Sequence, residues 1–201
     1  ALMAPPGGKK VMLGTNPICM YVPTKSYGPL CLDIATSTVA QGKLFDYKLK
    51  HKELGEGWSV DIDGNPTKDP EKAAFLIPFG AHKGYGIAVF VEVLCAILSG
   101  GAIGAGINSL ANEPDKPNNI SFCFAGLKIE SFRNPEEFKE DMDRLVEYLH
   151  STPAAEGKSV LVPGEIEIKT RQENLQEGIS IPEDLEQSLR NIAKELNVDF
   201  D

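Results

Sequence analysis

The sequence predicts an α+β fold or a mixed sheet with packed helices. Three apolar runs have the length of strands, and four segments carry the spacing or end signals of helices, in mixed order along the 201 residues. With 42% hydrophobic residues the chain can bury one substantial core, and its length also permits two unequal lobes. We expect one lobe over residues 1–127 and a mainly helical lobe over residues 128–201.

Two strands are predicted near the start of the chain. Ile18 to Val22 and Leu30 to Ile34 are apolar runs, and the turn-forming segment Pro23 to Pro29 separates them. This pattern predicts a hairpin or a pair of neighbouring strands. A third strand is expected over Ile120 to Leu127, and Val160 to Val162 is a further short candidate.

Two helices are predicted in the first lobe. The hydroxyl cluster Thr36 to Thr38 is suited to cap a helix over Val39 to Lys52. The apolar run from Gly86 to Gly100 predicts a buried helix that ends in a left-handed glycine cap. It contains Glu92 and is shorter than the roughly 18 residues of a membrane span. Between these helices, Gly55 to Pro70 is rich in glycine, proline and acidic residues, which predicts an exposed excursion.

Two further helices are predicted in the second lobe. Asn134 to Glu137 combines a capping asparagine, a proline at the first helical position and a glutamate three residues after the cap. Apolar residues then recur at helical spacing, at Phe138, Met142, Leu145 and Leu149. Pro182 opens a last helix with Leu185, Leu189, Ile192 and Leu196 on one face.

Charge and cysteine usage narrow the class of protein. A net charge of -9 and a pI near 4.9 argue against nucleic-acid binding, because such proteins concentrate Lys and Arg. Cysteines at 19, 31, 95 and 123 form no C-x-x-C pair, so we expect buried thiols in a cytoplasmic protein and no zinc site. Asp61 to Asn65 is similar to the start of a calcium loop but has Pro66 and Lys72 where glycine and glutamate are needed, so no metal is expected.

The first candidate site follows the second predicted strand. No G-x-G-x-x-G motif follows a strand, so a Rossmann nucleotide site is not indicated. Asp33 ends the strand, and Thr36, Ser37 and Thr38 offer hydroxyls and backbone donors at a helix start, an arrangement able to hold ribose and phosphate oxygens. An ordinary helix cap remains the alternative interpretation.

The second candidate site lies at the start of the apolar helix. His82, Lys83 and Tyr85 are polar, and Gly84 and Gly86 would let a ligand approach the backbone closely. The alternative is a turn with a solvated lysine. His51 and His150 have no Ser, Cys or carboxylate partner identifiable by spacing and are interpreted as surface residues, so no catalytic triad is predicted.

Six motifs in shared order and spacing together resemble the malate/L-lactate dehydrogenase family, which includes L-sulfolactate, ureidoglycolate and 2,3-diketogulonate enzymes. The resemblance covers nearly the whole chain. The motifs are Leu13-Gly14-Thr15-Asn16-Pro17, Leu32 to Ser37 with Gly42-Lys43, Glu56-Gly57-Trp58, Asp63 to Thr67, Lys83 to Gly86 and Val162-Pro163-Gly164-Glu165.

The resemblance implies a non-Rossmann fold with a large, mostly antiparallel sheet, a homodimer and an NAD(P)H site. The residues that match cofactor-contacting positions are Asp33, Ile34, Ala35, Thr36 and Ser37, then Lys83, then Gly164 and Glu165. His82, a directional donor beside Lys83, is also expected to contact the cofactor. The choice between NAD and NADP stays open, because no basic residue can be assigned to a 2′-phosphate.

The family's proton-donating histidine and its carboxylate-binding arginine are expected upstream of Ala1, so none of the printed residues is assigned a catalytic role. The segment Ala1 to Gly8 looks like the middle of a protein. The upstream part could be a separate chain, a cleaved piece or simply not included in the sequence.

The implied reaction is hydride transfer between the nicotinamide and C2 of a small 2-hydroxy or 2-oxo acid, with malate the expected substrate. Two alternatives stay open. One is a cyclic-imine reductase of the Δ1-piperideine-2-carboxylate type, from the same family. The other is a non-catalytic fragment that keeps only the fold.

Overall fold

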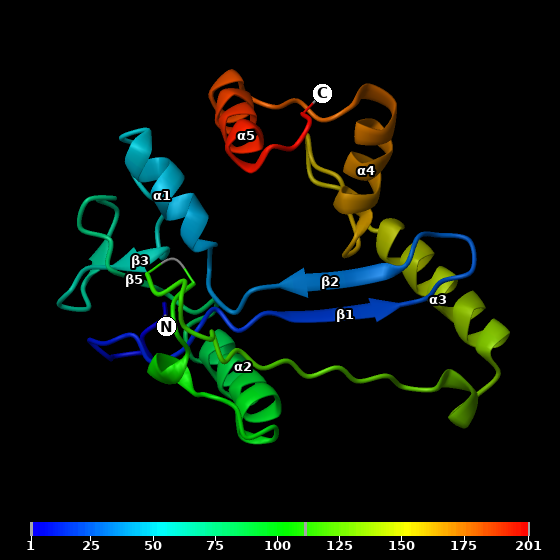
Figure 1. Cartoon of the computed structure of the whole chain (residues 1–201). Helices are drawn as coiled ribbons and strands as arrows, with labels where there is room; N and C mark the ends of the chain where they lie inside the picture. Colours follow the sequence, from blue (N-terminus) through cyan, green and yellow to red (C-terminus); the bar gives the residue numbers. More distant parts are fainter. Residues whose placement is uncertain (1, 111, 201) are drawn as a thin grey trace. The chain divides into compact units, whose positions relative to one another are not determined.

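Five α-helices and two small sheets are present in the computed structural model, which describes residues 2–110 and 112–200 (Figure 1). The α+β class is confirmed. By its contacts the chain divides into unit 1, Ala1–Val22 with Cys31–Phe138, and unit 2, Pro23–Leu30 with Lys139–Asp201. A domain boundary after residue 127 stays a prediction.

The first sheet pairs β1 (Ile18–Val22) with β2 (Leu30–Ile34), as the apolar runs predict (Figure 1). A second sheet has the order β4-β3-β5 and is antiparallel, with β3 (Ser59–Val60) between β4 (Pro66–Thr67) and β5 (Phe75–Leu76). The large sheet that the resemblance implies is therefore not formed by the described residues.

The segment Gly55 to Pro70 is exposed at many of its residues, as its composition predicts, but part of it is packed into unit 1. It contains β3, whose Ser59 is 1% exposed and donates its hydroxyl to the carbonyl of Phe75 at 2.8 Å. The calcium-like motif is a turn, in which the Asp61 carboxylate accepts the N–H groups of Asp63 and Asn65, both at 2.9 Å. These bonds, with the hydrogen bond from Asn65 first, hold the pKa of Asp61 below its ordinary value.

The core of unit 1 lies where the N-terminal segment, β5 and helix α2 (His82–Glu92) meet. Met3, Leu76 and Ala88 are buried there, with partly buried residues packed around them at Leu2, Leu13, Val39 and Leu44. Met3 is held by isolated bridges to Leu13 and Leu76. This packing holds α2 through Ala88, and the second candidate site lies in the first turn of the same helix.

Helix α2 (His82–Glu92) continues into a π-helical turn over Val93–Ile97 and ends where Gly100 has a φ of 73°. The left-handed glycine cap is confirmed, and the N–H of Gly101 donates to the carbonyl of Ala96. The predicted burial of this helix is found only in part. Burial follows one stripe of small residues and a glutamate, and large apolar side chains such as Phe90 are exposed.

The strand predicted over Ile120 to Leu127 is absent, because none of the described residues pairs with its backbone. Phe122 and Phe124 are 67% and 92% exposed. A strand needs a neighbour to satisfy its backbone groups, so apolar composition alone does not produce one. Val160 to Val162 likewise forms no strand, although Val162 is buried.

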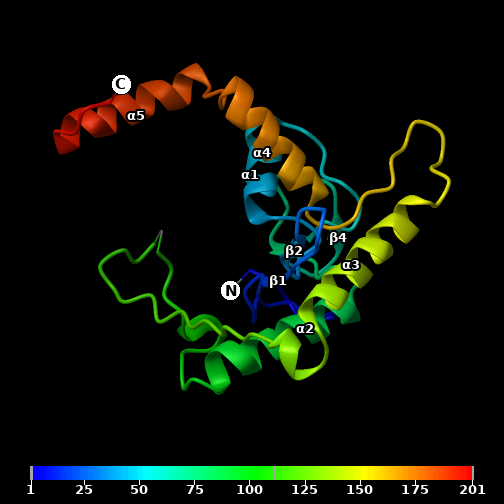
Figure 2. The same ribbon diagram turned by 90° about the vertical axis from the view of Figure 1, so that its right-hand side faces the viewer.

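The remaining helices are α1 (Gln41–Leu49), α3 (Pro135–His150), α4 (Glu165–Glu177) and α5 (Glu183–Leu196), and Figure 2 shows α3, α4 and α5 as separate rods joined by irregular chain. The predicted cap of α3 is confirmed, since Asn134 accepts the N–H groups of Glu136 and Glu137. None of the described helices has the length and apolar character needed to cross a membrane.

The expectation that the four cysteine thiols are buried is wrong. Cys19 and Cys123 are exposed, and Cys31 and Cys95 are partly exposed. Cys19 lies on β1, most of which faces solvent, and Cys123 lies in the unpaired segment after Ile120. Residue type alone predicts that cysteines are buried. The strand β1, which carries Cys19, and the segment after Ile120, which carries Cys123, are however uncovered among the described residues.

Candidate functional site

The first candidate segment begins in the last residues of β2, in unit 1. Asp33 is exposed, and its carboxylate has no hydrogen-bond or ion-pair partner among the described residues. Ile34 and Ala35 are partly exposed and connect it to the buried Thr36 and Ser37. Asp33 is therefore the side chain of this segment that is available to a ligand.

The hydroxyls of this segment do not cap a helix. Helix α1 starts only at Gln41, and its N-cap Ala40 makes no side-chain cap bond. Thr36 is fully buried and donates its hydroxyl to the carbonyl of Thr15 at 2.7 Å, and Ser37 donates to the carbonyl of Val39 at 2.8 Å. Both the cap and the helix-start interpretations are wrong here, because backbone carbonyls already accept these hydroxyl protons.

The second candidate segment is joined to the first by backbone contacts. The N–H of Phe79 donates to the carbonyl of Thr36 at 3.0 Å, and the N–H of Thr38 donates to the carbonyl of Ile77 at 2.8 Å. Gly84 packs on the same carbonyl of Thr36: a β-carbon at Gly84 would lie 2.8 Å from it. The structure thus brings the end of β2 and the start of α2 together.

His82 and Lys83 form the exposed first turn of α2. Lys83 has no salt bridge to any residue in the described ranges. The turn before it is strained, since Ala81 has a φ of 51° and a ψ of -107° without being glycine. Gly84 serves close packing of the chain on itself and not the approach of a ligand, whereas Gly86 faces open space.

The third predicted contact, Gly164 and Glu165, lies in unit 2 at the start of α4. Gly164 has a φ of 100°, a conformation that favours glycine. The N–H of Glu165 donates to the carbonyl of Val162, and the Glu165 carboxylate accepts the N–H of Val162 at 2.9 Å. This reciprocal pair fixes the turn from Val162 to Glu165.

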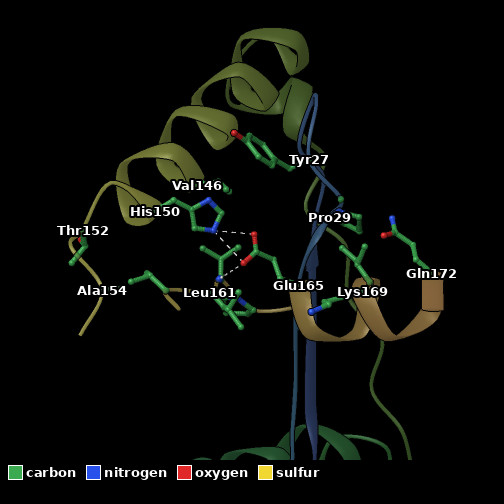
Figure 3. Close-up of a pocket in the computed structure, with 15 residues that line it drawn as sticks. Tyr27, Pro29, Val146, His150, Thr152, Ala154, Leu161, Glu165, Lys169 and Gln172 are labelled. Carbon is green, nitrogen blue, oxygen red and sulfur yellow. Dashed lines mark hydrogen bonds and ion pairs between the residues drawn. The ribbon is translucent and has the colours of Figure 1, made fainter. Parts of the chain in front are cut away.

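Glu165 lines a cavity of about 530 Å³ within unit 2 (Figure 3). Its volume falls in the range of ligand pockets. Apolar walls are supplied by Pro29, Val146, Leu161 and Ile168, and polar groups by Tyr27, His150, Lys169 and Gln172.

The interpretation of His150 as a surface residue without a carboxylate partner is wrong. Its Nε2 lies 2.9 Å from Oε1 and 3.1 Å from Oε2 of Glu165. The ring is 31% exposed and meets Tyr27 edge to face, with ring centroids 6.4 Å apart. Sequence spacing could not show this pair, because an irregular segment separates the end of α3 from the start of α4.

A carboxylate also anchors the chain beside this cavity. The carboxylate of Asp143, on α3, accepts the backbone N–H of Lys25 at 2.9 Å and the backbone N–H of Ser26 at 2.9 Å. Burial raises the pKa of Asp143, but the hydrogen bonds from Ser26, Lys25 and Tyr27 outweigh it and hold the pKa below its ordinary value. Burial, followed by the charges of Glu147 and Asp143, raises the pKa of Tyr27.

The chain belongs to the malate/L-lactate dehydrogenase family, whose family model matches residues 1–190. It is 37% identical over 201 residues to an L-sulfolactate dehydrogenase of Methanocaldococcus jannaschii, covering 99% of this chain and 57% of that protein. It is 36% identical over 209 residues to a malate dehydrogenase of Pyrococcus horikoshii, covering 98% and 57%. The chain thus spans little more than half the length of these relatives.

Solved structures agree with this membership. The sulfolactate dehydrogenase structure from Methanocaldococcus jannaschii matches with a TM-score of 0.84 at 36% identity, over 98% of this chain and 57% of that chain. The malate dehydrogenase structure from Pyrococcus horikoshii OT3 matches with a TM-score of 0.78 at 32% identity, over 98% and 56%. The predicted family is therefore confirmed.

Proposed function

We propose that the protein is an oxidoreductase that transfers a hydride between NAD(P) and C2 of a small 2-hydroxy or 2-oxo acid, with malate as the first candidate. The carrying observation is that Asp33 and Lys83, two charged side chains without an ion-pair partner among the described residues, lie on segments that backbone bonds hold together in unit 1. The names of the relatives, malate and sulfolactate dehydrogenases, support the substrate class, since malate and sulfolactate are both 2-hydroxy acids.

The residues of unit 1 suit the polar parts of a nicotinamide cofactor. The Lys83 ammonium is free to bind a phosphate, and the first turn of α2 adds the positive end of the helix dipole. The Asp33 carboxylate is free to accept hydrogen bonds from ribose hydroxyls. Ile34, Ala35 and His82 border these groups, while Thr36 and Ser37 position the segment from within. When bound, the cofactor supplies the hydride chemistry.

Gly164 and Glu165 of unit 2 are proposed as further cofactor contacts. The cavity beside Glu165 and its partly exposed carboxylate, at 26%, support this role. Whether the cofactor is NAD or NADP is to be decided by titration with both.

We assign proton transfer and carboxylate binding to a histidine and an arginine outside the printed sequence, in an upstream segment or a separate chain. No residue of the described ranges is proposed to perform these steps. A homodimer in the cytoplasm is proposed as the working form. The exposed apolar residues of α2 and of the segment 120–127 support association, because large uncovered apolar patches mark interfaces.

A cyclic-imine reductase is the second candidate function. The chain is 46% identical over 100 residues, 49% of its length and 29% of the other protein, to a Δ1-pyrroline-2-carboxylate reductase of Agrobacterium fabrum. A Δ1-piperideine-2-carboxylate reductase structure from Pseudomonas syringae also matches with a TM-score of 0.78 at 27% identity, over 96% of this chain and 57% of that chain.

A substrate panel separates these functions. The full-length protein should oxidise malate, L-lactate or sulfolactate with NAD or NADP and leave the cyclic imine acid unreduced. Reduction of Δ1-pyrroline-2-carboxylate in preference to all three acids would favour the reductase. No binding of NADH or NADPH, with the upstream segment present, would favour a non-catalytic fragment.

A further inference from the structure

The Glu165 carboxylate is held by two donors. The N–H of Val162 donates to Oε2 at 2.9 Å, and Nε2 of His150 lies 2.9 Å from Oε1 (Figure 3). A carboxylate has about four lone-pair sites, so these contacts leave Oε1 able to accept another hydrogen bond. The side chain is 26% exposed and lines the cavity, so a ligand there can supply that bond.

His150 is itself fixed by its surroundings. It is the last residue of α3, and the ring of Tyr27 packs edge to face against it at 69°. The ionisable groups around the pair are Tyr27, Asp143 and Glu147 on one side and Lys169 of α4 on the other. Lys169 is 78% exposed and pairs loosely with Glu173 at 3.9 Å, which leaves His150 as the close partner of Glu165.

Apolar side chains line the cavity beside the His150–Glu165 pair. Val146, Leu161 and Ile168 line the same cavity as the pair, whose side chains are only 31% and 26% exposed, and a hydrogen bond strengthens as burial removes competing water. Without His150, the carboxylate would keep only the bond to Val162, and its side chain could rotate toward solvent.

We propose that His150 is a positioning residue for cofactor binding, because it aims the free lone pair of Glu165 into the cavity, where it accepts a hydrogen bond from a ribose hydroxyl or an amino group of the nicotinamide cofactor. This inference deepens the proposed function and rests on it. His150 acts through Glu165 and needs no contact with the cofactor.

The test compares three variants of the full-length protein by fluorescence titration with NADH and NADPH. His150→Leu should weaken binding of the preferred cofactor about tenfold, the range of a hydrogen bond to a charged group. His150→Gln, whose amide nitrogen reaches about as far as Nε2, should stay within about threefold of wild type. His51→Asn, at an exposed position outside the cavity, is the control and should leave the affinity unchanged, because asparagine tolerates the left-handed φ of 49° at this position.

A double-mutant cycle shows whether His150 acts through Glu165. The pair His150→Leu with Glu165→Gln should bind no more weakly than Glu165→Gln alone. Additive losses, or a His150→Leu variant that binds like wild type, would overturn the inference while the proposed function stands. If wild type binds neither cofactor, both fail. Should His150→Leu not fold, His150→Asn gives the same comparison, because its shorter amide cannot reach Glu165.

Discussion

Gly84 lies so close to Thr36 that a β-carbon on it would come within 2.8 Å of the Thr36 carbonyl oxygen, and within 2.5 Å of the Phe79 carbonyl oxygen. These atoms are backbone, so they cannot move aside as a flexible side chain would. The contact joins the end of β2 to the start of α2 and so holds Asp33 and Lys83 on adjoining segments. The glycine is required for packing.

Gly84→Ala should therefore destabilise the protein by about 1–3 kcal/mol, the usual cost of overpacking. Gly86→Ala is the matched control, because it lies two residues further along the same helix and faces open space. It should be neutral or stabilising by up to about 1 kcal/mol, since alanine favours helix. Thermal denaturation of both variants checks this. Equal stabilities for the two would contradict the packing role of Gly84.

Glu92 should be the most sensitive polar position of α2. It is 9% exposed, and its carboxylate accepts the N–H of Gly104 and the side-chain amide of Asn16, both at 2.9 Å. Glu92→Leu leaves the N–H of Gly104 and one N–H of the Asn16 amide, which also donates to the carbonyl of Ala88, without this acceptor, and should cost roughly 2–5 kcal/mol of folding free energy. Urea denaturation measures the loss. Glu92→Gln keeps one acceptor oxygen, so its free energy of unfolding should lie between those of wild type and Glu92→Leu. A Glu92→Leu variant as stable as wild type would show that these two hydrogen bonds do not stabilise the fold.

Asp143 should make the stability of the protein depend on acid. Its pKa is lower in the folded state than the roughly 3.9 of an unfolded chain. The charged Asp143 carboxylate therefore adds its full share to the free energy of unfolding above the unfolded pKa. That share is lost as pH falls through the pKa of the folded state. Between pH 5 and pH 2, the melting temperature of Asp143→Asn should fall less than that of wild type.

Asp115→Asn, at an exposed loop position, is the control for this pH series and should follow wild type. If the melting temperatures of wild type and Asp143→Asn fall in parallel as pH is lowered, the hydrogen bonds from the N–H groups of Lys25 and Ser26 do not need the charged form of Asp143, and the prediction is wrong.

Local patterns predicted the elements whose determinants are local. The strands β1 and β2 and the cap of α3 at Asn134 depend on neighbouring residues, so a short stretch of sequence carries the information. The strand expected over Ile120 to Leu127 depends on a partner elsewhere. The same composition therefore forms no strand where none of the described residues pairs with it.

In the candidate site, too, features set by neighbouring residues are predicted, and features that depend on distant residues are not. His82 and Lys83 were predicted at a helix start, and α2 begins at His82. The interpretation of the Thr36 and Ser37 hydroxyls as a helix cap is wrong. Thr36 donates instead to the carbonyl of Thr15, 21 residues earlier, which local sequence cannot show. His150 was missed because its partner Glu165 lies beyond an irregular segment. Helix α4 was missed because its residues show no apolar stripe.

Binding of a nicotinamide cofactor to the Lys83 segment is the central claim, and fluorescence titration of the full-length protein with NADH and NADPH tests it most directly. Wild type should bind one of them, and Lys83→Ala should bind it about tenfold more weakly, as expected for loss of a charge-assisted bond to phosphate. Lys10→Ala, at an exposed lysine outside the site, should bind like wild type. Equal affinity of Lys83→Ala and wild type would contradict the account.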